Sequence, residues 1–486
     1  MHLGRTASVT PLLASLLLAT PAMPQAGAAK VPITTSSEEA RQLYVQGRDF
    51  VEKLRMADGY PLFEKAVAKD PGFALGYFGL ASAAPTNQTF FNALRQAVAL
   101  AGKVSEGERL MILGLDAGVN GNPEGQRTMY TLLVEKFPGD ERALTLLGNF
   151  YFAQQKYPAA IEHLAHAVKI APQYTAAYNQ LGYAYRFEGK YAEAEKTFQK
   201  YIEVLPGDPN PHDSYAELLM KLGRFEESIA SYRKALEVDP TFTASLVGIA
   251  NDQMFLGQGD EARKTLRQLT AISRNDGEAR QALFWTAQSY VLEGRYPEAV
   301  KAVQEERAIA ERSGDFGAQS QDTILIGNIW LKAGKTDTAA SSFAEAVTLM
   351  GKASVPPEVK EANRRNSLFN GARVTLARGD LKGARAQAAE FARQVEVKRI
   401  PFEIWQVHEL NGMIAIAGKD YELALTELGK STDQNPRVLY LTAVALQGKG
   451  DRERARAAAK AAADFNALNG LYAFVRPEAK RMLAGS

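Results

Sequence analysis

Four prolines stand 34 residues apart in this chain, and the stretch before each of them follows one pattern. They are Pro138, Pro172, Pro206 and Pro240. Self-similarity at a fixed period of this size is the signature of stacked structural repeats. Because each unit of such an array packs mainly against its neighbours, the chain is constrained to an elongated repeat architecture and not one compact core.

One unit, residues 174–206, shows what the pattern does. Its apolar residues recur at spacings of three and four, which marks one face of each of two short helices. We predict that Gly182 and Ala194 allow the two helices to approach closely and that Phe198 fills the space beside them. Pro206 ends the second helix, because proline cannot continue the ladder of backbone hydrogen bonds.

The series of aromatic, Leu, Gly, aromatic, Ala, aromatic and Pro positions in this unit resembles the tetratricopeptide repeat, whose period is also 34. The pattern can be followed outward over nearly all of residues 38–470. The resemblance implies an all-α fold, a right-handed superhelical solenoid of about twelve antiparallel helix pairs.

The chain divides into five expected segments. Residues 1–28 are read as a signal peptide and residues 29–37 as a short N-terminal extension. The remaining segments are an N-terminal array over 38–274, a more divergent array over 275–470 that continues the same solenoid, and a capping tail over 471–486.

The first residues predict export from the cytoplasm. A short polar start is followed by the apolar run Leu12–Leu18 and by small residues, with Ala26 and Ala28 as the expected recognition pair for cleavage. No later stretch is long and apolar enough to span a bilayer. The chain has no cysteine, which excludes disulfides and a lipidated cysteine. We therefore expect a periplasmic or secreted protein without a membrane span after cleavage.

Charge and motifs favour no catalytic or nucleic-acid function. Lys and Arg number 57 against 55 Asp and Glu, which gives no basic footprint for nucleic acid. His163 and His166 lie three residues apart, but no third ligand is near, so no metal site is expected. Residues 257–262 match G-x-G-x-x-A at an expected helix–helix turn, without the strand that a dinucleotide site needs. No cofactor is expected.

In the resembled family, first helices line a concave groove that often holds an extended peptide. Carried over by repeat position, the resemblance implies a set of groove residues, mostly with polar or aromatic side chains. They are Asn149, Asn179, Gln180, Tyr183, Arg186, Asp213, Glu217, Asn251, Trp285 and Asn328. Asn149, Asn251 and Asn328 occupy the same place in three units, and an amide can pair with a peptide backbone as donor and acceptor.

The resemblance thus implies a non-enzymatic scaffold or adaptor of the bacterial cell envelope that binds a protein or peptide partner. An alternative is a structural subunit of an envelope assembly or polysaccharide-export complex that uses its outer face or self-association. Apolar residues near the C-terminus are candidates for that outer surface: Ile400, Pro401, Phe402, Trp405, Leu471, Phe474 and Val475.

Overall fold

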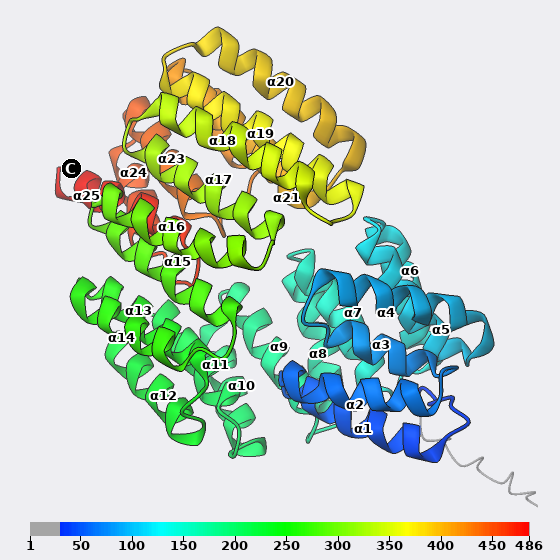
Figure 1. Cartoon of the computed structure of the whole chain (residues 1–486). Coiled ribbons are helices and arrows are strands. Elements are labelled where there is room, and N and C mark those ends of the chain that lie inside the picture. Colours follow the sequence, from blue (N-terminus) through cyan, green and yellow to red (C-terminus); the bar gives the residue numbers. More distant parts are fainter. Residues whose placement is uncertain (1–29, 486) are drawn as a thin grey trace, which may run out of the picture.

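The computed structural model describes residues 30–485, and in this range the chain forms 25 α-helices and one short 3₁₀ helix, with no β-strand (Figure 1). The predicted signal peptide lies outside the described residues. The first helices are α1 (Glu38–Glu52), α2 (Met56–Lys69), α3 (Ala74–Ser82), α4 (Asn87–Leu100), α5 (Glu106–Val119), α6 (Pro123–Lys136), α7 (Glu141–Ala153), α8 (Tyr157–Ile170), α9 (Thr175–Phe187), α10 (Tyr191–Val204), α11 (Asn210–Lys221), α12 (Phe225–Val238), α13 (Thr243–Phe255) and α14 (Gly259–Ile272). The rest are α15 (Asp276–Leu292), α16 (Tyr296–Arg312), α17 (Phe316–Lys332), α18 (Thr336–Lys352), α19 (Pro357–Ala377), α20 (Leu381–Lys398), α21 (Pro401–Ala417), α22 (Tyr421–Leu428), α23 (Pro436–Lys449), α24 (Arg452–Ala463) and α25 (Leu471–Ala484).

Consecutive helices form hairpins that stack on one another. From α1–α2 to α23–α24, each odd-numbered helix packs against the even-numbered helix that follows, and each hairpin packs against the next. Odd-numbered helices also contact one another, as α7 does α9 and α11 does α13, so they form the inner layer of the solenoid. The predicted solenoid of about twelve helix pairs is confirmed. Its predicted right-handed sense stays a prediction.

The small residues of the repeat sit where the helices meet most closely. A Cβ atom placed on Gly182 would lie 2.5 Å from the Phe198 ring, and one on Gly148 would lie 2.7 Å from Leu164. Ala194 is fully buried on the opposing helix. These pairs are each 16 residues apart, so the same interlock recurs at the same place in successive units. The roles predicted for Gly182, Ala194 and Phe198 are confirmed.

Helix ends follow the expected chemistry. Helix α10 ends at Val204, two residues before Pro206. Between α9 and α10, Gly189 has a φ of +77°, a left-handed conformation that a residue without Cβ adopts at no steric cost. Residues 257–262 likewise lie at the turn between α13 and α14, with helix and not strand before them.

The second half begins with six longer helices. Helices α15 to α20 contain 17 to 21 residues, whereas α6 to α14 contain 12 to 14. The extra residues of this half therefore lengthen helices instead of forming separate domains.

The last helix turns back into the solenoid. Helix α25 packs against α24, as a cap does, and also against α15 and α23, which belong to the inner layer (Figure 1). Its Tyr472 is fully buried, and the Tyr472 hydroxyl donates a hydrogen bond of 2.9 Å to Oδ1 of Asn251 in α13. The C-terminal helix thus occupies part of the concave side.

An extended segment, residues 30–37, crosses the beginnings of α5 and α7. The backbone N–H of Thr34 donates to Glu108 at 2.7 Å, and that of Val31 donates to Asp140 at 2.8 Å. Glu108 also accepts from the backbone N–H of Ser105, which makes it part of the capping box of α5. The segment therefore ties together repeats that are not adjacent to it in sequence.

Candidate functional site

The inner layer of the first five helix pairs surrounds a pocket of about 230 Å³. Its wall is mostly apolar, from Phe78 of α3, Met111 of α5 and Leu146 of α7. Polar groups of Arg48 in α1 and Asn149 in α7 also line it. We call this hollow the N-terminal pocket. A concave, largely apolar site with a few convergent polar groups is the usual form of a ligand-binding site.

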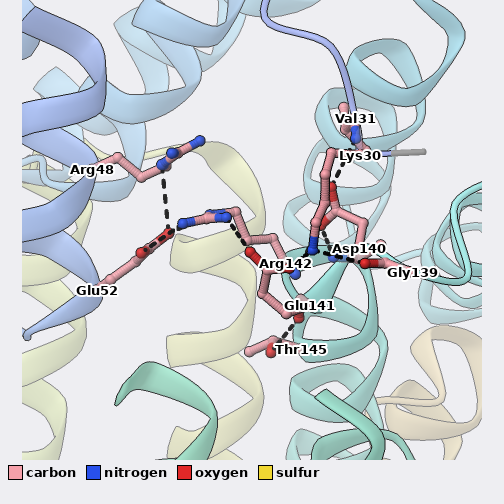
Figure 2. A network of polar contacts seen from close by, with 10 residues as sticks. Lys30, Val31, Arg48, Glu52, Gly139, Asp140, Glu141, Arg142 and Thr145 are labelled. Atoms are coloured by element: carbon pink, nitrogen blue, oxygen red, sulfur yellow. Dashed lines mark hydrogen bonds and ion pairs between the residues drawn. The ribbon is translucent and has the colours of Figure 1, made fainter. Parts of the chain in front are cut away.

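A network of charged side chains joins α1 to α7 (Figure 2). Arg142 of α7 donates to both carboxylate oxygens of Glu52 in α1, at 2.6 and 3.0 Å. Arg48 lies 3.6 Å from the same carboxylate. A two-bonded arginine–carboxylate pair fixes geometry as well as charge. The network therefore links α1 to α7 through side chains, although 90 residues separate Glu52 from Arg142 in sequence.

The extended segment adds a cation to the network. Lys30 pairs with Glu141 and donates to the Gly139 carbonyl at 2.8 Å (Figure 2). Burial raises the pKa of Glu141, but the hydrogen bond from Lys30 and the charge of Arg142 outweigh it, so the pKa is lowered. Tyr44, in the wall of the pocket, has its pKa raised to about 12 by burial.

Two buried polar atoms at this pocket have no hydrogen-bond partner within residues 30–485. They are Oδ1 of Asn149, an acceptor, and Nε of Arg48, a donor. A buried polar atom without a partner costs free energy, and such atoms in a native structure call for an explanation. Here they offer one acceptor and one donor to a molecule in the pocket.

Three of the predicted groove residues, Asn149, Asn179 and Gln180, line the N-terminal pocket. Asn179, however, donates to Oδ1 of Asn210 and to Oγ of Ser214, both at 2.9 Å. Its amide N–H groups are therefore used inside the fold. Asn149 retains a free acceptor.

The next predicted residues are engaged within the protein. Arg186 of α9 and Glu217 of α11 form an ion pair of 3.2 Å at the edge of another hollow. Tyr183 packs edge-on against Phe198, with 5.3 Å between ring centres. Asp213 is buried and accepts a hydrogen bond of 2.7 Å from Ser245, while burial and the charge of Glu217 raise its pKa to about 8.

Helix α25 covers two further predicted residues. Asn251 is fully buried beneath Tyr472, and Trp285 stacks on the Tyr472 ring with 6.4 Å between centres. Asn328, in α17, lies in the wall of a second hollow. The predicted groove residues thus do not form one continuous surface, and that they bind a partner stays a prediction.

The second hollow, about 670 Å³, lies among α15, α17, α19, α21, α23 and α25, and we call it the C-terminal chamber. Several apolar residues proposed for an outer surface line it instead: Phe402, Trp405, Leu471, Phe474 and Val475. Phe402 is also 63% exposed and Ile400 38% exposed, so part of that apolar set does face solvent.

The sequence pattern did not single out the charged residues of the N-terminal pocket. Tyr44, Arg48 and Glu52 lie four residues apart in α1 and therefore share one helix face. That spacing was the feature of the sequence from which a shared polar face on α1 could have been predicted. Arg142 follows the helix start of α7, where nothing in its own repeat indicates a partner 90 residues away.

The alternative chemistries gain no support from the described residues. Within residues 30–485 no three His, Cys, Asp or Glu side chains come together as metal ligands. His163 stacks on Tyr151 with 5.6 Å between ring centres. Among the helices of the same range, none combines the length and hydrophobicity that a membrane span requires.

Comparisons with known proteins give one family and many partial relatives. Family models described as tetratricopeptide repeat match residues 140–206 and 219–283. The chain is 25% identical over 225 residues to the TPR repeat-containing protein YpiA of Bacillus subtilis, covering 44% of this chain and 49% of that protein. It is 27% identical over 129 residues to Hsp70-Hsp90 organizing protein 3 of Arabidopsis thaliana, covering 26% of this chain and 21% of that one. A third relative is anaphase-promoting complex subunit 3 of Schizosaccharomyces pombe, 21% identical over 220 residues, with 45% and 32% coverage.

The matches span less than half the length of each of these three relatives. Among solved structures, a tetratricopeptide repeat protein from Parabacteroides merdae aligns with 54% of this chain and 99% of its own, at 17% identity and a TM-score of 0.38. The MamA protein aligns with 36% of this chain and 94% of its own, at 20% identity and a TM-score of 0.31.

Proposed function

Because this chain is a tetratricopeptide repeat protein, we propose that it is a protein-binding scaffold that holds an extended segment of a partner in its N-terminal pocket. The observation that carries the proposal is a pair of buried polar atoms in a mostly apolar hollow that make no hydrogen bond within residues 30–485: Oδ1 of Asn149, and Nε of Arg48, which has only a 3.6 Å ion-pair contact with Glu52. An extended peptide supplies the complementary groups, a backbone N–H for the first atom and a carbonyl for the second.

The apolar wall supports recognition of one large apolar side chain of the partner. Phe78, Met111 and Leu146 line a hollow of about 230 Å³, which suits a single anchor and not a long stretch. The two-bonded ion pair between Glu52 and Arg142 fixes the pocket wall before the partner binds, and this lowers the entropy cost of binding.

The names of two relatives agree with a scaffolding role, since one organizes Hsp70 and Hsp90 and another is a subunit of the anaphase-promoting complex. For the place of action we propose the periplasm or the exterior of a bacterial cell, on the strength of the apolar and small residues of segment 1–28. No catalytic role is proposed.

A second candidate is assembly through the outer face. It is favoured by three exposed apolar side chains at the turn from α20 to α21, namely Val397, Ile400 and Phe402, which are 77%, 38% and 63% exposed. Exposed apolar groups that gather at one place often mark a contact surface. This candidate includes an envelope assembly subunit and self-association of the chain.

The test is crosslinking of the tagged protein in intact cells, followed by mass spectrometry of captured partners. The parent is compared with Asn149→Ala/Arg48→Gln and with Val397→Ser/Ile400→Ser, whose two residues are exposed and lie outside the C-terminal chamber. We expect specific partners to be lost with the first variant and retained with the second. Loss with the second variant alone would move the interaction to the outer face, and retention with both would refute the pocket.

The first variant is suited to this purpose. Oδ1 of Asn149 makes no hydrogen bond within residues 30–485, so losing it removes little internal stabilisation, whereas Arg48→Gln also removes the 3.6 Å ion pair with Glu52 and needs a check of folding. Unchanged circular dichroism and an unchanged melting midpoint would show that lost partners reflect the pocket and not unfolding.

A further inference from the structure

We propose that the C-terminal chamber binds a small organic carboxylate with an aromatic or other apolar body. This ligand class differs from the extended peptide proposed for the N-terminal pocket, and the two proposals stand or fall separately. The chamber of about 670 Å³ is the roomier hollow. Five of its six helices are successive inner-layer helices of the array, and the sixth is the C-terminal helix α25, which packs back against them.

The charges of the chamber wall are unbalanced. Among its lining residues are three cations, Lys332, Arg373 and Arg437, and a single carboxylate, Glu409. Glu409 is already satisfied, because Arg437 pairs with one oxygen and Asn435 donates to the other at 3.0 Å. Lys332 pairs with Glu478 of α25. Arg373 is the remaining cation, and no carboxylate within residues 30–485 lies in ion-pair distance of it.

Arg373 is held in position by amides. Its Nη1 donates to Oδ1 of Asn328 at 2.8 Å and to Oδ1 of Asn370 at 2.9 Å. These bonds orient the guanidinium without neutralising it, and its Nη2 and Nε make no hydrogen bond to the described chain. Burial and the nearby charge of Arg437 lower the pKa of Arg373, and the charge of Glu409, which acts in the opposite direction, does not offset them. A carboxylate is the planar two-oxygen group that suits such a fork.

The rest of the wall suits an apolar body. The rings of Phe284, Phe369, Trp405, Tyr440 and Phe474 all line the chamber. Arg373 lies over the Phe369 ring at 5.4 Å, so the cation and the aromatic wall adjoin each other. Oε1 of Gln288 also faces this region, is buried, and has no hydrogen-bond partner within residues 30–485. It is available to accept from an O–H or N–H group of the ligand.

The boundaries of the chamber favour a compact ligand over an extended chain. On one side α25 contributes Leu471, Phe474 and Val475, and Lys332 fixes that helix by a hydrogen bond of 2.5 Å to the Phe474 carbonyl. On another side Thr432 donates to Gln155, which lies 277 residues earlier in the chain, at 3.2 Å. A peptide passing through would have to part these contacts, whereas a small molecule need not.

The test is calorimetric titration of the full chain with three probes that share one body. They are phenylbutyrate, phenylbutanol and phenylbutylamine, which carry a negative, a neutral and a positive head. We expect the carboxylate to bind at least about tenfold more tightly than the alcohol and the amine to bind most weakly. Absence of carboxylate binding up to about 10 mM, or equal binding of all three probes, would overturn the proposal.

A variant series assigns the site. Arg373→Gln should weaken phenylbutyrate binding about tenfold or more and leave phenylbutanol binding unchanged, and Arg373→Lys should recover part of the difference. Arg393→Gln, at an arginine of α20 whose side chain is 71% exposed and lies outside the chamber wall, is the matched control and should have no effect. Retained carboxylate preference in Arg373→Gln would refute the role of Arg373. If that variant does not fold, the comparison of probes on the unaltered chain decides.

Discussion

At the scale of single residues, the repeat is held together by contacts between a small residue and a ring. Substitution of Gly182→Ala would place a Cβ 2.5 Å from the Phe198 ring. We expect a net destabilisation of about 1–3 kcal/mol, because strain in a filled core outweighs the better helix propensity of alanine. The midpoint of urea unfolding, followed by circular dichroism, measures it.

Gly351→Ala is the control for this prediction. Gly351 also lies in a helix, but a Cβ there would meet nothing within 4 Å. It should be neutral or stabilising by up to about 1 kcal/mol. Equal effects of the two substitutions would mean that the close approach at Gly182 does not matter.

Asp252 gives a prediction for pH. The side chain is fully buried, both its oxygens lack a hydrogen-bond partner within residues 30–485, and burial followed by the charge of Glu226 raises its pKa to about 8. Between the unfolded value of 3.8 and about 8, the folded state binds a proton that the unfolded state does not. Stability contributed by this group therefore falls as pH rises across that window.

Asp252→Asn removes this titration. We expect its melting midpoint to fall less between pH 6 and pH 8 than that of the parent, with the two chains most alike at the acidic end. Asp213 and Glu306, also raised to about 8 by burial, leave part of the pH dependence in place. The surface variant Asp49→Asn should follow the parent. An identical slope in Asp252→Asn and the parent would contradict the prediction.

Sequence reasoning worked for residues whose neighbours lie in the same repeat. Gly182, Ala194 and Phe198 were predicted correctly because a 34-residue period determines what each contacts. It worked less well for the groove, since Asn251 and Trp285 are covered by Tyr472, which lies 221 residues after Asn251. No local pattern indicates a contact at that distance.

At the scale of elements, we expect that loosening the packing of α25 lowers stability and speeds hydrogen exchange in several other helices. Tyr472→Ala deletes a buried ring that contacts Phe255 at 4.7 Å and leaves Asn251 without its donor. We expect a loss of about 3–5 kcal/mol, as for other large aromatic residues replaced in a core. Hydrogen exchange should accelerate in α13, α15 and α25 and stay unchanged in α1 to α6.

Tyr191→Ala provides the comparison, because Tyr191 is 37% exposed at the start of α10. It should alter neither the stability nor the exchange of α13 and α15. If Tyr472→Ala changed exchange only within α25 itself, then α25 would be a peripheral addition and not a part of the inner layer.

At the scale of the whole molecule, stability should be shared between neighbouring hairpins. Deleting residues 175–208 removes α9 and α10 while keeping the 34-residue register. We expect calorimetry to show a lower and broader melting profile, because an array loses cooperativity when an internal interface is replaced. A single transition at the parent temperature would contradict this nearest-neighbour description.

The number and order of helix pairs were predicted from the sequence, whereas the contacts between helix pairs far apart in the chain were not. Periodicity predicts which hairpins are neighbours, and nearest-neighbour contacts are confirmed throughout. Two contacts of this kind are present. The ion pair between Glu52 and Arg142 joins residues 90 positions apart, and the hydrogen bond between Thr432 and Gln155 joins residues 277 positions apart. Such contacts depend on how far each hairpin is rotated from the last, a quantity that accumulates over many units and is not written in any one of them.

The return of α25 to the inner layer also sets an order of events during synthesis. Hairpins form from local contacts and can assemble as soon as each has emerged, since helix pairs close quickly. The ring of Tyr472 reaches Asn251 only after the whole of the intervening chain exists. The aromatic rings of Trp285 and Phe255, which Tyr472 covers in the complete chain, therefore stay exposed to solvent until the last residues are made. A polypeptide that ends shortly before Tyr472 would leave these rings exposed and would be prone to aggregation.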